Sequence, residues 1–137
     1  MTEARKAVWI VDDEPDVLTY LLVALEDHGF RVRAFSGAEG FLEEARQAPP
    51  DLVCLDIMMP NRSGLSLYVD IRKEEALRGV PILIVSGYSR PGEVLRDEFR
   101  RLIGDAGVTE PEGFLEKPII LDDFLARVRT AVSGAGT

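Results

Sequence analysis

Three short runs of apolar residues constrain the fold of this chain more than any other feature. They occupy residues 7–11, 52–55 and 80–85, and each leads directly into acidic or polar residues. Continuous apolar runs of about four to eight residues are typical of strands that are buried on both faces. Such strands occur mainly in parallel sheets whose two faces are covered by helices. The runs therefore predict a layered α/β structure.

Amphipathic segments separate the apolar runs. Apolar side chains recur at helical spacing in residues 15–28, 38–48, 64–79, 91–103 and 121–132. Residues 31–35 alternate between polar and apolar side chains and predict an edge strand, and residues 113–116 predict a short last strand. Strands and helices thus alternate five times, which favours right-handed crossovers and a parallel sheet. We expect a flavodoxin-like, doubly wound, five-stranded sheet of order 2-1-3-4-5 with helices on both faces.

The composition predicts one domain over residues 1–137, with its core at 7–132 and no effector domain after it. A net charge of −8 argues against direct binding to nucleic acid, because neutralising phosphates requires a basic face. The single cysteine, Cys54, excludes an internal disulfide and is expected to be a small buried side chain. We find neither a signal peptide nor an apolar run long enough to insert into a membrane, so the expected location is the cytoplasm.

Polar side chains follow the predicted strands at the point where each strand ends. They are Asp12 and Asp13, Asp56, Ser86, and Lys117. The carboxyl ends of parallel strands share one edge of the sheet, where ligands bind in open α/β folds. Three carboxylates at one edge repel one another unless a cation lies among them. Oxygen ligands without histidine or cysteine suit a hard divalent ion such as Mg²⁺.

The same edge carries a candidate nucleophile. Asp56 ends a buried strand, and Lys117 and Ser86 would supply a positive charge and a hydroxyl beside it. Such a set can stabilise a phosphoryl group in transfer, with Asp56 forming an acyl phosphate. A flavodoxin-type cofactor site is disfavoured because the acidic residues 12–14 would repel a phosphate. A haloacid-type phosphohydrolase would need a second aspartate two residues after the nucleophile, where Met58 stands.

Four short motifs carry a resemblance to a known family. They are Asp12-Asp13-Glu14-Pro15, Asp56-Ile57-Met58-Met59-Pro60 with Gly64, Ser86-Gly87, and Lys117-Pro118. With these motifs the chain resembles, from residue 8 to about residue 132, a response-regulator receiver domain of two-component signalling. The resemblance implies a signalling switch, whose only catalysis is its own Mg²⁺-dependent phosphorylation and hydrolysis.

The resemblance also implies a role for each matching residue. Asp13 and Asp56 would bind Mg²⁺, or Mn²⁺ in its place, directly, with Asp12 acting through water and the backbone carbonyl of Met58 as a further ligand. Asp56 would accept the phosphoryl group from a histidine kinase or histidine phosphotransferase. Ser86 would hydrogen-bond that group and Lys117 would pair with it. A downstream protein would then recognise the phosphorylated form.

The sequence departs from the family pattern at two places. Phe114 stands where the family often has a switch tyrosine, so a hydroxyl contact is missing. The chain between Ser86 and Lys117 is longer than usual, with the excess at residues 90–112, which affects the family's common output surface. An alternative function is a pseudo-receiver that acts as a constitutive interaction module without phosphate. The complete set of acidic, hydroxyl and lysine side chains favours the switch.

Overall fold

The sheet has the order expected from the sequence. The computed structural model describes residues 5–57, 64–86 and 92–134. Within them, five parallel strands pair in the order β2-β1-β3-β4-β5, which confirms the flavodoxin-like topology. The strands are β1 (Ala7–Val11), β2 (Arg31–Phe35), β3 (Leu52–Asp56), β4 (Ile82–Ser86) and β5 (Gly113–Glu116). The helices are α1 (Pro15–Asp27), α2 (Phe41–Gln47), α3 (Gly64–Lys73), α4 (Gly92–Ala106) and α5 (Leu121–Gly134), with a short 3₁₀ turn, η1 (Glu75–Leu77).

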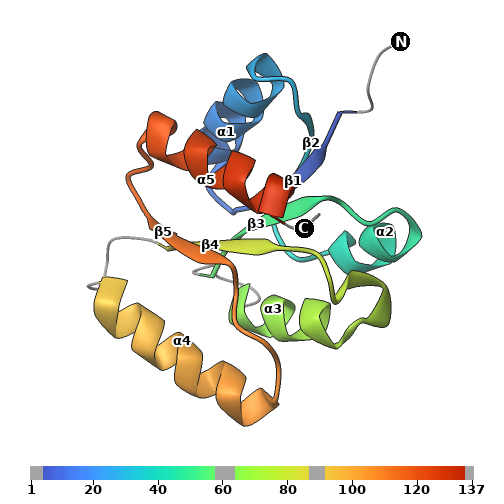
Figure 1. Cartoon of the computed structure of the whole chain (residues 1–137), viewed down its shortest axis with the longest axis vertical. Helices are drawn as coiled ribbons and strands as arrows, with labels where there is room; N and C mark the ends of the chain where they lie inside the picture. The colour runs from blue at the N-terminus through green and yellow to red at the C-terminus, as the bar shows by residue number, and fades with distance from the viewer. Residues whose placement is uncertain (1–4, 58–63, 87–91, 135–137) are drawn as a thin grey trace.

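Helices cover both faces of the sheet. Figure 1 shows α1 and α5 on one side and α2, α3 and α4 on the other. Each side has its own apolar core, and every residue of β1 and β3 is buried between the two. The alternating strand β2 lies at an edge, with most of its side chains exposed, as predicted. No helix within the described ranges is both long enough and apolar enough to cross a lipid bilayer.

Three helix boundaries differ by more than two residues from those that periodicity predicted. Helix α2 begins at Phe41 instead of residue 38, because Gly40 adopts a left-handed conformation with φ of 79°. Helix α3 ends at Lys73, where Glu74 takes an extended conformation before η1. Helix α4 runs past Gly104 and ends at Ala106, and Gly107 follows it with φ of 73°. The left-handed glycine after a helix, and not the first glycine met, marks this end.

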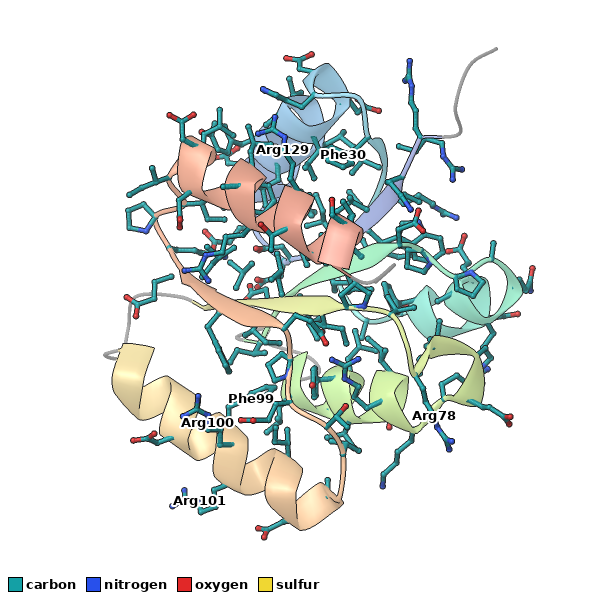
Figure 2. All side chains as sticks on the ribbon, viewed as in Figure 1. Phe30, Arg78, Phe99, Arg100, Arg101 and Arg129 are labelled. Atoms are coloured by element: carbon teal, nitrogen blue, oxygen red, sulfur yellow. The ribbon has the colours of Figure 1, made fainter. Side chains whose placement is uncertain are left out.

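Helix α4 packs on the rest of the molecule through an aromatic side chain. Phe99 is 2% exposed and points from α4 toward α3, whereas Arg101 points away (Figure 2). The Phe99 ring meets Tyr68 of α3 edge-to-face with 5.0 Å between centroids, and meets Phe114 of β5 at 5.5 Å. Such pairs stabilise a contact by about 0.5–1.5 kcal/mol beyond the area they bury. The three rings therefore link α3, α4 and β5.

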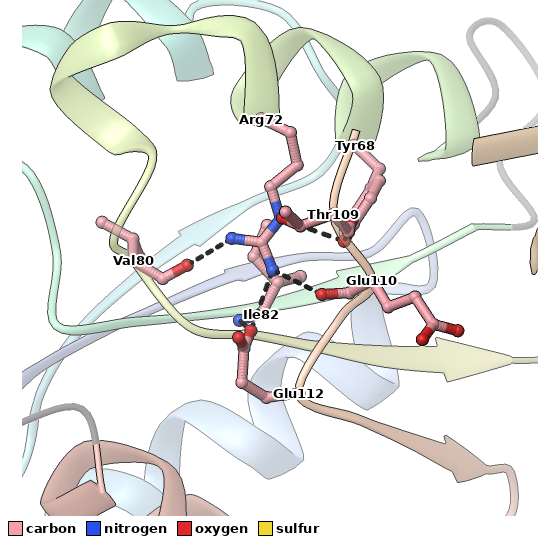
Figure 3. A network of polar contacts seen from close by, with 7 residues as sticks. All are labelled: Tyr68, Arg72, Val80, Ile82, Thr109, Glu110 and Glu112. Carbon is pink, nitrogen blue, oxygen red and sulfur yellow. Dashed lines mark hydrogen bonds and ion pairs between the residues drawn. The ribbon is translucent and has the colours of Figure 1, made fainter. Parts of the chain in front are cut away.

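A buried arginine fixes the connection between α4 and β5 (Figure 3). The guanidinium of Arg72, on α3, donates to the carbonyl oxygens of Val80 at 2.8 Å and Glu110 at 3.2 Å. It also donates to the Tyr68 hydroxyl at 3.0 Å and to the Glu112 carboxylate at 2.9 Å. The Arg72 side chain is only 3% exposed, and its bonds to Tyr68 and Val80 are buried, whereas the Glu112 side chain is 44% exposed.

The same network extends to both ends of this connection. The Tyr68 hydroxyl donates to the Thr109 carbonyl oxygen at 2.5 Å, and Glu112 accepts from the Ile82 backbone N–H at 2.6 Å. Residues 109–112 are therefore held against α3 and the start of β4. The long segment that the sequence marked as unusual ends in this buried network.

We expect Arg72→Met to lower the free energy of unfolding by about 2–4 kcal/mol, because it leaves buried acceptors without donors. Urea denaturation of the two proteins measures the difference. Arg78→Met is the matched control, since Arg78 is exposed and its replacement should change stability by no more than about 0.5 kcal/mol. Equal midpoints for the Arg72 and Arg78 variants would contradict the structural role of this network.

Candidate functional site

Three aspartates meet where β1 and β3 end. Asp12 follows β1, and its backbone N–H donates to the Phe35 carbonyl oxygen at 3.0 Å, which extends the sheet by one bond. Asp56 is the last residue of β3 and pairs with Val85 of β4. Asp12 and Asp56 are 1% and 2% exposed, and Asp13 is half-buried. The parallel register thus brings carboxylates that are distant in sequence to one edge.

The carboxylates are close enough to share a cation. One oxygen from each of Asp12, Asp13 and Asp56 lies within 4.8 Å of the other two. Oxygen ligands of this charge and spacing are those that Mg²⁺ and Ca²⁺ prefer. Because three clustered carboxylates carry more negative charge than a single lysine can offset, the composition and burial of this set fit a divalent cation.

Lys117 supplies a positive charge to the same edge. Its ammonium nitrogen lies 2.9 Å from Asp12 Oδ2 and 3.4 Å from Asp56 Oδ2. A third carboxylate, that of Glu14, is nearer still, at 2.5 Å. Burial alone would lower the pKa of Lys117, but the hydrogen bonds to Glu14 and Asp12 and the charge of Asp56 outweigh it and raise the pKa. The lysine is therefore fully charged at neutral pH.

The structure brings together most of the residues that the sequence singled out. Asp12, Asp13, Asp56 and Lys117 form one cluster, which follows from their common position after parallel strands. The backbone of Ser86 ends β4 opposite Glu116 of β5. Met58 lies outside the described residues.

Phe114 and Glu14 lie near this cluster or the strand that leads to it. Phe114 lies in β5, half-buried, and packs on Phe99. Glu14 was not predicted to contact Lys117, although its position directly after Asp12 and Asp13 was the available signal.

A glycine allows α3 to approach the end of β3. Gly64, the first residue of α3, packs so closely that a Cβ there would overlap the Asp56 carbonyl oxygen and the Ile57 Cα. Both obstacles belong to the backbone and cannot rotate away. Gly64 therefore sets the position of the Asp56 backbone from the side of α3.

Cys54 is a structural residue of the strand that carries Asp56. Its side chain is fully buried, and burial raises the pKa of the thiol to about 12. A thiol needs to ionise and to meet its target in order to act as a nucleophile. The prediction that Cys54 is a small buried side chain is confirmed.

Comparison with known proteins identifies a family over most of the chain. The response regulator receiver domain family matches residues 8–129. Among solved structures, a CheY-like response regulator receiver domain protein from Methanospirillum hungatei superposes with a TM-score of 0.80 at 22% identity. That match covers 97% of this chain and 98% of the other.

Curated relatives have different overall architectures. The transcriptional regulatory protein KdpE of Mycobacterium tuberculosis is 33% identical over 91% of this chain, which spans only 50% of KdpE. The response regulator DivK of Brucella ovis is 30% identical over 95% of this chain and 98% of DivK. The hybrid signal transduction histidine kinase D of Dictyostelium discoideum is 31% identical over 90% of this chain and 7% of the kinase. The chain thus spans about half the length of one relative and nearly the whole of another.

We expect Gly64→Ala to destabilise the fold by about 1–3 kcal/mol, because the new methyl group must displace the backbone at Asp56. Thermal melting measures the effect. Gly79→Ala is the matched control, because a Cβ at Gly79 has no atom within 4 Å among the described residues. A loss of stability that is as large at Gly79 as at Gly64 would refute the role given to the close contact.

Proposed function

Because the chain belongs to the family of response regulator receiver domains of two-component systems, we propose that it is a switch that is phosphorylated on Asp56. The observation that carries the proposal is the placement of this 2%-exposed carboxylate beside two other aspartates and a lysine ammonium. A receiver domain is a signalling domain and not a classical enzyme. Its chemistry is the transfer of a phosphoryl group to its own side chain.

The proposed transfer takes place at one oxygen of Asp56. A carboxylate oxygen attacks the phosphorus of a phosphohistidine, the new O–P bond forms, and the N–P bond breaks with its electron pair left on the imidazole. The ammonium of Lys117, 3.4 Å from Asp56 Oδ2, is near enough to offset charge on the phosphoryl oxygens. Ser86, which ends the neighbouring strand, is the proposed hydroxyl donor to the same group.

A divalent cation would complete the site. Asp13 and Asp56 are the proposed direct ligands, with Asp12 acting through water and the Met58 carbonyl as a further ligand. When bound, Mg²⁺ neutralises charge on the transferring phosphoryl group. Mn²⁺ is expected to replace it, since both ions take oxygen ligands in octahedral geometry.

We propose that Phe114 is the residue that carries the change outward. Its ring packs edge-to-face on Phe99 of α4, and Phe99 packs edge-to-face on Tyr68 of α3. Because Phe114 has no hydroxyl, its position depends on this packing. A shift of the Phe114 ring would therefore displace Phe99 and, with it, α4.

The proposed partners follow from the same chemistry. A histidine kinase or a histidine phosphotransferase in the cytoplasm would supply the phosphoryl group, and a downstream protein would read the phosphorylated form. Either a free-standing domain or a part of a longer protein could do this, since relatives of both kinds exist. A phosphate-independent interaction module would not need the buried lysine and its three carboxylate neighbours.

We expect Asp56→Asn to abolish phosphorylation by acetyl phosphate and Mg²⁺ while leaving the fold intact, because the amide is a poor nucleophile of nearly the same shape. Intact mass spectrometry measures the added phosphate, and circular dichroism checks the fold. Phosphate on the Asn variant at the parental rate would rule out Asp56 as the acceptor. A parent that gains none would favour the interaction module.

We also expect Mg²⁺ at millimolar concentration to raise the melting temperature of the unphosphorylated protein, because a ligand that binds only the folded state stabilises it. Asp13→Ala should remove most of this shift. Asp27→Ala removes the same charge from an exposed position at the far end of α1, and this variant should keep the Mg²⁺-induced rise in melting temperature. A Mg²⁺ shift that survives in the Asp13 variant would place the cation elsewhere.

A further inference from the structure

The ammonium of Lys117 is surrounded by three carboxylates. Its nitrogen lies 2.5 Å from Glu14 Oε1, 2.9 Å from Asp12 Oδ2 and 3.4 Å from Asp56 Oδ2. An ammonium group has three N–H donors, so each donor has one acceptor here. The residue proposed to be phosphorylated is the most distant of the three. Lys117 is thus drawn toward Asp12 and Glu14 and away from Asp56.

The Glu14 side chain is not used to cap the helix that it precedes. Glu14 is the N-cap residue of α1, where a side chain usually accepts a hydrogen bond from the first turn, yet its side chain makes no cap bond. The backbone N–H of Glu14 donates to the Asp12 carboxylate at 2.9 Å, which holds the Glu14 backbone beside the site. The Glu14 side chain, 57% exposed, turns back across the site to the buried Lys117. This contact joins residues that are far apart in the sequence.

Resting on the phosphorylation proposed above, we propose that Glu14 is a positioning residue that holds Lys117 in the unphosphorylated state and releases it when a phosphoryl group occupies Asp56. The donor that points at Asp56 Oδ2 can pass to a phosphoryl oxygen on that residue, but a second bond to the phosphoryl group requires Lys117 to give up Asp12 or Glu14. Asp12 is 1% exposed, and leaving its buried charge without a positive partner would be costly. Glu14 can return to water, so its bond is the one that breaks.

The weakness of the Glu14 contact suits this role. An ion pair with an exposed partner contributes little to stability, because water competes for the carboxylate and the long side chain loses freedom. A phosphoryl group carries more negative charge than a carboxylate and has several acceptor oxygens. It therefore competes successfully for the Lys117 donor. Removing Glu14 should bias the site toward the state in which Lys117 points at Asp56.

The test uses beryllofluoride, a phosphoryl mimic, in the presence of Mg²⁺. Glu14→Gln keeps the shape of the side chain and removes its charge. We expect the variant to bind beryllofluoride roughly two- to five-fold more tightly than the parent, the range set by an exposed ion pair. Fluorine NMR of the bound mimic measures the affinity, and thermal melting verifies that the variant is folded.

Asp16→Asn is the matched control for a general field effect. Asp16 lies in the first turn of α1 and lines the same surface pocket of about 260 Å³ as Glu14 and Lys117. It has no bond to Lys117 in the described structure, so its replacement removes one charge without freeing a donor. We expect less than a two-fold change in beryllofluoride affinity. An equal gain in the Asp16 and Glu14 variants would overturn the positioning role.

A spectroscopic readout separates positioning from a merely structural effect. The side-chain nitrogen signal of Lys117, assigned by its absence in Lys117→Met, should differ between parent and Glu14→Gln without the mimic. The two signals should coincide at saturating beryllofluoride, because Glu14 is then released in the parent. The proposal would be overturned if the Lys117 signals of parent and Glu14→Gln differed equally with and without beryllofluoride. It would also be overturned if they coincided in both conditions.

The design also separates this proposal from the one on which it rests. A parent that does not bind beryllofluoride, or that binds it equally well as Asp56→Asn, would refute the phosphorylation switch itself. A parent that binds the mimic through Asp56, with Glu14→Gln no tighter, would refute only the role of Glu14.

Discussion

The burial of like charges at one edge of a parallel sheet is the constraint on which the rest of this structure depends. Asp12 and Asp56 are nearly inaccessible to water, and Asp13 lies beside them. Two buried carboxylates with oxygens within 4.8 Å of each other would be unstable without positive charge, because little water screens their repulsion. Lys117 supplies that charge from the end of β5. The negative charge of the aspartates therefore always requires a positive partner, and binding of a divalent cation or a change in the contacts of Lys117 alters how that charge is offset.

Helix α3 connects this edge to the opposite side of the molecule. Its first residue, Gly64, packs on the backbone of Asp56. Its middle carries Tyr68, which meets Phe99 of α4. Its last turn carries Arg72, which holds the connection between α4 and β5. One helix thus contacts the candidate site, the aromatic rings and the buried polar network, so a displacement at Asp56 has a continuous packed route to α4.

The sequence was sufficient to predict the topology and the carboxylate cluster, since both depend on local signals. Buried strands read as apolar runs, and the residue that follows each run falls at a known edge of the sheet. Arg72 could not be identified in this way, because its acceptors at Glu110 and Glu112 lie in a distant loop. The position of Glu14 after Asp12 and Asp13 was a signal for its contact with Lys117, but the contact itself depends on the rotamer of an exposed side chain, which the sequence does not determine. Contacts between distant segments, and not element type, limited the prediction.

The Glu14–Lys117 contact and the Arg72 network differ in strength, and this difference matters for a switch. A switch needs an unphosphorylated conformation that is stable but separated from the phosphorylated one by only a small free-energy difference. This requires a few weak contacts among many strong ones. Glu14 offers an exposed, replaceable contact to Lys117, whereas Arg72 is buried and uses its donors in several directions at once. The weak Glu14 contact lies beside the proposed phosphorylation site, and the buried Arg72 network holds the segment that follows α4. Because Tyr68 and Arg72 hold the connection that follows α4 at residues 109–112, the movement that we propose Phe114 to transmit through Phe99 should concentrate in the earlier turns of α4.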